Sequence, residues 1–170
     1  MALPYFALIN SVEINKRKKG TTVLDVPANT FIKELASFFK EKNVIKPQKW
    51  SNLVKCSHAN EVVPLDPDYM FYKAAAIARI LYVTKSKAIG VGSLRSFFGK
   101  KMRRGVEPPK FMKAAGKIIR EIVKQLKANG YVENYGAKGN SVTYGMVLTK
   151  QGRTELDKIA INLQGEEILS

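Results

Sequence analysis

Lysine and arginine recur through the middle of this 170-residue chain at spacings that suit a polyanion. One cluster places four cations within five residues, Lys100 to Arg104. A second set recurs at intervals of three or four residues, which on a helix puts every member on one face. Its members are Lys110, Lys113, Lys117, Arg120, Lys124 and Lys127. Because rows of like charge repel one another, they indicate a surface that phosphate groups or another polyanion neutralises.

The net charge of +15 is concentrated in one third of the sequence. Residues 71–130 contain fifteen basic and two acidic residues, whereas residues 1–70 carry a net +3 and residues 131–170 a net −1. Charge that served solubility alone would be spread along the chain, so this segregation favours a dedicated binding face. Nucleic acid is the first candidate partner and an acidic membrane surface the second.

The other reactive side chains form no catalytic or metal-binding motif. Cys56 is the only cysteine and His58 the only histidine, so the chain offers no disulfide framework and no thiolate zinc cluster. A cysteine and a histidine this close in sequence, without a carboxylate to orient the histidine, make a poor nucleophile and base. Asp66 and Asp68 are better explained as helix caps than as an acid and a base. We therefore expect a non-enzymatic protein without cofactor, metal or small-molecule substrate.

Hydrophobic spacing outlines the elements that must position the cations. Pro108 and Pro109 are interpreted as the start of the longest helix, which Gly130 would end. Strands over residues 131–135 and 142–148 are predicted to form a β-hairpin. The predicted helices span residues 25–43, 66–82, 94–98, 110–129 and from 149 onward, with a shorter amphipathic piece over 47–57.

A glycine-rich turn precedes the short helix at residue 94. Gly90, Gly92 and Ser93 would present free backbone N–H groups at a helix N-terminus, which suit a phosphate oxygen. The third glycine of a dinucleotide-binding fingerprint is missing, because Arg95 stands at its position. The turn therefore indicates phosphate binding without a nucleotide cofactor.

A helix that ends at glycine and runs into a hairpin is typical of a winged helix-turn-helix, in which that helix commonly meets nucleic acid. We predict a mostly α fold with a small β-hairpin, winged-helix-like, over residues 21–165. Residues 1–20 would form an N-terminal lead-in that includes the basic cluster at 16–19. The early apolar stretch Leu3 to Ile9 is too short for a membrane span or a secretory signal, so we expect a soluble intracellular protein.

Short strings of residues also resemble the archaeal and eukaryotic ribosomal protein S19e family of the small subunit, in the family's order over about residues 21–161. The most specific run extends from Ala78-Arg79 to Gly92-Ser93. Other resembling strings are Pro47-Gln48-Lys49-Trp50, Pro64-Leu65-Asp66, Gly105-Val106 with Pro108, and Leu148-Thr149 with Gln151-Gly152.

The resemblance implies a structural constituent of the small ribosomal subunit. It would bind ribosomal RNA in the subunit head, contact neighbouring small-subunit proteins, and support RNA maturation and subunit assembly. It would act in cytoplasmic ribosomes, with a nuclear or nucleolar assembly stage in a eukaryote. By spacing alone, Trp50 is favoured as a core anchor over a base-stacking platform. The residues expected to bind RNA are Trp50, Lys55, Arg79, Lys85, Lys87, Gly90, Gly92, Ser93, Arg95, Lys100, Lys101, Arg103, Arg104, Lys110, Lys113, Lys117 and Arg120.

Three features depart from the family pattern. Residues 1–20 precede its usual start, and Lys150 stands where the family often has proline. The wing between Glu133 and Leu148 is longer and lacks a basic residue directly before Leu148, which weakens the expectation of a wing–RNA contact. The alternative function is a winged-helix DNA-binding regulator, but the predicted row carries only cations and no base-reading Asn or Gln. A membrane surface is disfavoured because the apolar face of the 110–129 helix is needed for the core.

Overall fold

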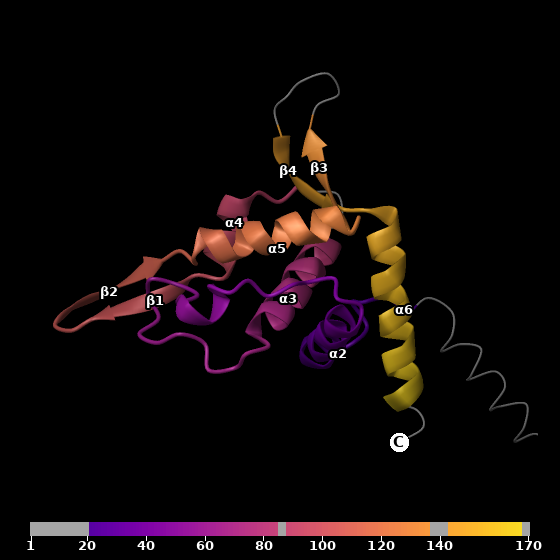
Figure 1. The fold of residues 1–170 in the computed structure, drawn as a ribbon, viewed down its shortest axis with the longest axis horizontal. Coiled ribbons are helices and arrows are strands. Elements are labelled where there is room, and N and C mark those ends of the chain that lie inside the picture. The colour runs from indigo at the N-terminus through magenta and orange to yellow at the C-terminus, as the bar shows by residue number, and fades with distance from the viewer. Residues whose placement is uncertain (1–20, 85–87, 137–142, 168–170) are drawn as a thin grey trace, which may run out of the picture.

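The computed structural model describes residues 21–84, 88–136 and 143–167 (Figure 1). This part of the chain is mostly helical, with five α-helices and two small antiparallel sheets of two strands each. The elements in chain order are α2 (Ala28–Glu41), a 3-10 turn η1 (Ser51–Leu53), α3 (Tyr69–Val83), α4 (Val91–Phe97), β1 (Lys100–Arg104), β2 (Glu107–Met112), α5 (Gly116–Ala128), β3 (Val132–Gly136), β4 (Thr143–Leu148) and α6 (Lys150–Glu167).

One hydrophobic core joins the helices to the β3–β4 sheet. Its apolar side chains recur at the helix spacing that the sequence shows, and burying one of them fully contributes about 1.5–3 kcal/mol. The ring of Phe39 on α2 meets the ring of Tyr131 edge-on, with 5.6 Å between centroids. The largest fully buried side chains are Phe31, Phe39, Leu35, Ile45, Met70, Ile77, Leu81, Leu94, Ile118, Ile119, Ile122 and Leu126.

Helix α3 begins at Tyr69, three residues after the predicted start, and Asp68 at its N-cap makes no side-chain capping hydrogen bond. The Asp66 carboxylate accepts a hydrogen bond from the Asp68 N–H at 2.8 Å. Asp68 in turn pairs with Lys40 of α2, with 2.6 Å between Nζ and Oδ2. The hydrogen bond from Lys40 to Asp68 raises the pKa of the Lys40 ammonium. This turn therefore both begins α3 and ties it to α2.

Helix α6 begins where the sequence predicts, because the Thr149 hydroxyl accepts a hydrogen bond from the Gly152 N–H at 3.0 Å. Two tyrosines hold the helix against the core. The Tyr131 hydroxyl donates to Glu155 and the Tyr82 hydroxyl donates to Asp157, each at 2.6 Å. Burial, together with the hydrogen bond to Asp157, raises the pKa of Tyr82 to about 12.

Residues 100–112 form a β-hairpin, so the predicted helix from Lys110 is wrong. Gly105 has φ +68° and, with Val106, makes the two-residue turn that brings Arg104 opposite Glu107. A positive φ at the first turn position is the glycine signature of a tight hairpin. The pair Pro108-Pro109 lies in β2 itself, where the fixed proline φ suits an extended exposed strand.

Helix α5 therefore begins only at Gly116 and is shorter than α6, with 13 residues against 18. The predicted amphipathic segment over residues 47–57 is also longer than the helical turn observed there, which is η1 alone. Leu53, an apolar residue of that segment, is 78% exposed and does not pack against the core.

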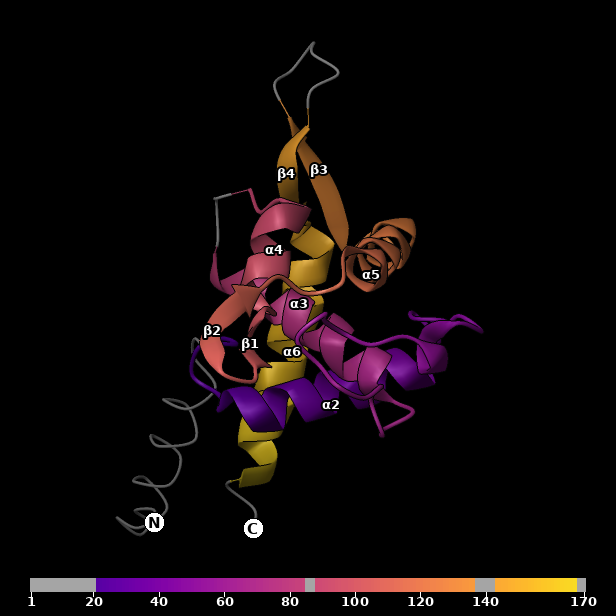
Figure 2. The ribbon, with the colours of Figure 1, turned by 90° about the vertical axis from the view of Figure 1, so that its left-hand side faces the viewer.

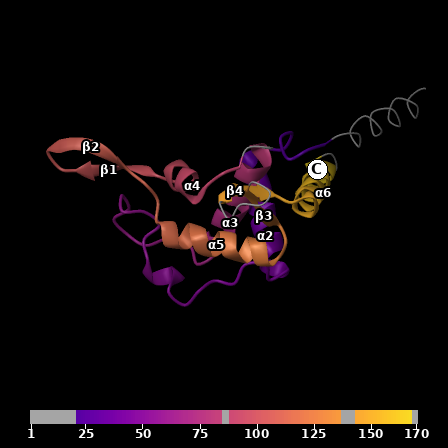
Figure 3. The same ribbon diagram turned by 90° about the horizontal axis from the view of Figure 1, so that it is seen from above.

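The predicted hairpin near the C-terminus is confirmed as β3 paired antiparallel with β4. Gly130 ends α5 with φ +75°, the left-handed conformation that glycine adopts just past a helix. Ile89, before α4, makes an isolated antiparallel bridge to Met146 on β4, which draws α4 to this sheet. The β1–β2 hairpin projects from one end of the molecule and α6 stands at the opposite end (Figures 1 and 3).

Candidate nucleic-acid interface

The β1–β2 hairpin is a cationic arm that projects from the body (Figure 1), and Figure 2 views the molecule from the end that carries it. It carries five exposed basic side chains and one carboxylate, that of Glu107. Glu107 is 2.8 Å from an Arg104 guanidinium nitrogen, and Arg104 also donates to the Pro108 carbonyl at 2.7 Å and 3.1 Å. Within the described residues the other four cations of the arm form no ion pair: Lys100, Lys101, Arg103 and Lys110.

Hydrogen bonds to the backbone hold the base of this arm. Such support is needed because a two-stranded hairpin alone is only marginally stable in water. The Arg95 Nε donates to the Ala114 carbonyl, and the Ala114 N–H donates to the Arg95 carbonyl, both at 2.9 Å. The Ala115 N–H donates to the Cys56 carbonyl at 2.9 Å. Arg95, predicted to face RNA, is half-buried here and has a structural task as well.

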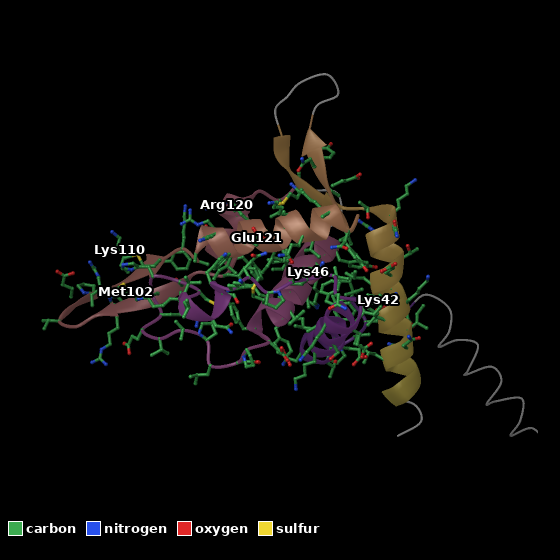
Figure 4. All side chains as sticks on the ribbon, viewed as in Figure 1. Lys42, Lys46, Met102, Lys110, Arg120 and Glu121 are labelled. Atoms are coloured by element: carbon green, nitrogen blue, oxygen red, sulfur yellow. The ribbon has the colours of Figure 1, made fainter. Side chains whose placement is uncertain are left out.

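The predicted row of six cations is divided among three segments. Lys110 lies on β2 and Lys113 in the connection to α5, while the remaining four lie on α5. Figure 4 shows Lys110 on the arm and Arg120 on α5, well apart along the molecule. We call the four on α5 the cationic row: Lys117, Arg120, Lys124 and Lys127. The buried face of the same helix is formed by Ile118, Ile119, Ile122, Val123 and Leu126.

Two members of the cationic row have neighbours within the protein. The Lys127 ammonium donates to Asn134 on β3. The Lys117 ammonium lies 4.4 Å from the centroid of the Trp50 ring. Trp50 is half-buried and packs against the core, so its prediction as a core anchor agrees with its position.

At the first residue of α5 two arginines approach each other. A Cβ placed on Gly116 would lie 2.8 Å from an Arg120 guanidinium nitrogen and 3.3 Å from the Arg95 Cδ. Both side chains therefore lie against this glycine, at the positive end of the helix dipole. The arrangement concentrates positive charge between the arm and the cationic row.

The glycine turn before α4 is open to solvent. Neither Gly90 nor Gly92 has a positive φ, and a Cβ on either would meet nothing within 4 Å. The described structure therefore gives no internal steric reason for these glycines, which leaves room for a partner to approach the backbone closely. Gly92 and Ser93 are exposed. Lys85 and Lys87 lie outside the described residues.

The remaining predicted positions lie elsewhere on the surface. Lys55 is exposed on the loop that precedes the arm's anchor. Arg79 on α3 is half-buried, and its Nε is buried without a hydrogen-bond partner among the described residues. A buried donor in this state costs about 1–3 kcal/mol. Arg79 thus occupies its position at a cost to stability.

Sequence reasoning missed Lys73. It stands in the apolar run of α3, and its ammonium lies 5.3 Å from the centroid of the Phe98 ring, just before β1. Only the fold brings these two segments together, so no spacing in the sequence signals the pair. Within the described residues no group of three or more histidine, cysteine or acidic side chains could hold a metal ion, and no helix is long and apolar enough to cross a membrane.

Comparison with known proteins matches this chain to one family over nearly all of the described structure. The model of the family "Ribosomal protein S19e" matches residues 22–166. The small ribosomal subunit protein eS19G of Ascaris suum is 38% identical over 146 residues, which cover 86% of this chain and 94% of the relative. The eS19 protein of Argopecten irradians is 36% identical over 145 residues, covering 85% and 95%.

A fission-yeast relative, eS19A of Schizosaccharomyces pombe, is 34% identical over 148 residues, which cover 87% of this chain and 97% of that protein. The resemblance predicted from short residue strings is confirmed, and with it the prediction of a ribosomal, non-enzymatic protein. This chain belongs to the ribosomal protein S19e family.

Proposed function

We propose that this protein is a structural component of the small ribosomal subunit that binds ribosomal RNA in the subunit head and supports RNA maturation and subunit assembly. Family membership and the names of the relatives support the ribosomal role. The observation that carries the RNA-binding role is the cluster of basic side chains on the arm and the cationic row, of which only Arg104 forms an ion pair within the described residues. These two surfaces carry most of the net charge of +13 of residues 71–130, on the projecting arm and along α5.

Phosphate binding dominates this mechanism. Exposed lysine and arginine displace condensed counterions from RNA, and the release of those ions drives association. If about six to ten phosphates are contacted, the affinity falls by roughly 10³–10⁵ between 50 and 200 mM salt. Folded RNA is then recognised chiefly through its shape and backbone. The predicted RNA-facing residues, including Lys55, Arg79 and the Gly90 turn, remain proposals within this scheme.

We also infer a winged-helix-like arrangement within residues 21–165. Helices α3, α4 and α5 follow in order, the two-stranded β3–β4 sheet comes directly after α5, and an isolated bridge joins Ile89 to Met146 on β4. The cationic row then lies on the helix that commonly meets nucleic acid in this architecture. The arm is an insertion between α4 and α5 that widens the same basic surface.

The proposed partners are small-subunit ribosomal RNA and the neighbouring proteins of the subunit. The proposed location is the cytoplasmic ribosome, with an earlier nuclear or nucleolar assembly stage in a eukaryotic cell. The names of the relatives, all small-subunit proteins, support this placement.

Charge reversal on the arm tests the proposal. The variant Arg103→Glu with Lys110→Glu changes two exposed side chains without breaking the Arg104–Glu107 pair. In sucrose gradients of cell extracts we expect the wild-type chain to sediment with small subunits and the variant to remain near the top. The matched control is Lys33→Glu with Lys158→Glu, two exposed lysines on α2 and α6.

Nuclease treatment distinguishes RNA from DNA as the partner. RNase is expected to release the wild-type chain from the fast-sedimenting fractions, whereas DNase leaves it there. Release by DNase alone would favour a winged-helix DNA-binding regulator. Normal incorporation of the arm variant, with an unchanged circular dichroism spectrum, would reject the cationic arm as an RNA contact.

A further inference from the structure

A groove of about 880 Å³ lies between α3, the loop over residues 56–64 and the base of the arm. Its volume falls within the range of about 300–1,000 Å³ that takes a ligand of drug size. Apolar atoms of Ile32 and Ala76 contribute to its lining. Part of its wall is β1 itself, so the groove is continuous with the cationic arm.

Aromatic side chains contribute to the lining of this groove. Tyr72 on α3 is 39% exposed, whereas Phe71 beside it is 7% exposed and belongs to the core. Phe98 lines the groove where the chain enters β1. The exposed ring of Tyr72 is therefore a flat surface in the groove on which a ligand could stack.

Positive charge lines the same groove. Lys73, Lys100, Lys101 and Arg103 all contribute to the groove, against one carboxylate, that of Glu61. Within the described residues none of these four cations forms an ion pair, and of the four only Lys73 has its ammonium over an aromatic ring. The groove thus combines aromatic rings with unneutralised cations at its edge.

We propose that this groove binds unpaired nucleotides of the RNA, with a base stacked on Tyr72 and the adjoining phosphates on Lys101 and Arg103. Proteins hold single-stranded nucleic acid by this combination of a cationic channel and exposed rings. A base within an A-form duplex is stacked on its neighbours, so only an unpaired segment offers a free base to Tyr72. The inference rests on the RNA-binding role proposed above, and continuity with the arm favours RNA over a peptide as the occupant.

The test compares two RNA probes on the full chain. One is a twelve-nucleotide unstructured RNA that contains 4-thiouridine, and the other is a twelve-base-pair RNA duplex. We expect Tyr72→Leu to weaken binding of the single strand about tenfold, the scale of one lost stacking contact, and to leave the duplex within about twofold. Tyr72→Trp keeps an aromatic face and should retain binding. The matched control is Tyr135→Leu, an exposed tyrosine on β3.

Photo-crosslinking locates the contact. The wild-type chain should crosslink to the 4-thiouridine strand within the peptides that contain Tyr72 or Phe98, and Tyr72→Leu should lose that adduct. The groove proposal is overturned if Tyr72→Leu binds the single strand as wild type does, or weakens both probes equally. It is also overturned if a poly-glutamate peptide of equal charge competes for the groove and the RNA strand does not.

The two proposals fail differently. A wild-type chain that binds neither RNA probe contradicts the RNA-binding role itself, and the groove proposal falls with it. A wild-type chain that binds the duplex, with no effect of Tyr72→Leu on the single strand, contradicts the groove proposal alone. Unfolding curves of each variant show that a loss of binding does not come from a loss of fold.

Discussion

The two antiparallel strand pairs of this molecule have matching lengths, but only one of them contributes residues to the core. Strands β1 and β2 contain five and six residues and are exposed along nearly their whole length. Strands β3 and β4 also contain five and six residues. Strand β3 is exposed after its first residue, but Val132 on β3 and Met146 and Leu148 on β4 lie buried in the core. An antiparallel pair with one buried face is the common, self-supporting arrangement. The arm lacks that face, so its stability depends on the contacts at its base, and its charge forms part of the surface proposed above to bind RNA.

The largest expected effect lies on the buried strand pair. Leu148 is 4% exposed, and truncation to alanine leaves a cavity that the core cannot fill. We expect Leu148→Ala to lower the free energy of unfolding by about 3 kcal/mol, measured by urea denaturation. A loss below about 1 kcal/mol would show that this face of β4 contributes little to the core, and the contrast with the arm would fail.

A smaller, local effect is expected at the base of the arm. Arg95→Met keeps the apolar stem of the side chain but removes the bond from Nε to the Ala114 carbonyl. Hydrogen bonds of charged groups contribute about 1.5–3 kcal/mol. Hydrogen exchange should therefore accelerate at amides of residues 100–112 by tenfold or more, while α2 and α3 keep their protection. Uniform acceleration across the chain would mean that the arm and the core unfold together.

The smallest effect is expected at the tip of the arm. Val106 is fully exposed, so its side chain gives up no burial when it is replaced by serine. We expect Val106→Ser to change the free energy of unfolding by less than about 0.5 kcal/mol, measured under the same denaturation conditions as Leu148→Ala. A larger loss would place Val106 in a contact that the described structure lacks.

Helices and strands in which apolar residues recur at a regular spacing were predicted well. The helices α2, α3 and α6 follow from apolar residues at helix spacing and from signals at their ends, such as Thr149 before α6. The pair β3–β4 follows from apolar strands on both sides of a polar turn. These patterns are local, because each element must turn one apolar side to the core.

Residues 110–115 were predicted wrongly as helix because the regular spacing there is one of charged residues. Lysines three and four residues apart fit a helix. Exposed charged side chains need not face the core, however, so their spacing does not determine whether the segment is a helix or a strand. Pro109 is as compatible with an exposed strand as with a first helical turn. Gly105 at the turn and the anchor of Arg95 on Ala114 favour the hairpin.

The sequence by itself determined the family, the helical character of the domain and the concentration of positive charge in residues 71–130, because these depend on residue identity and local spacing. Only the tertiary structure decided how that charge is divided between the arm and α5, and that Lys73, Tyr72 and β1 line one groove. The physical reason is that strand pairing and the meeting of α3 with the arm join residues far apart in the chain, and no local pattern encodes such contacts.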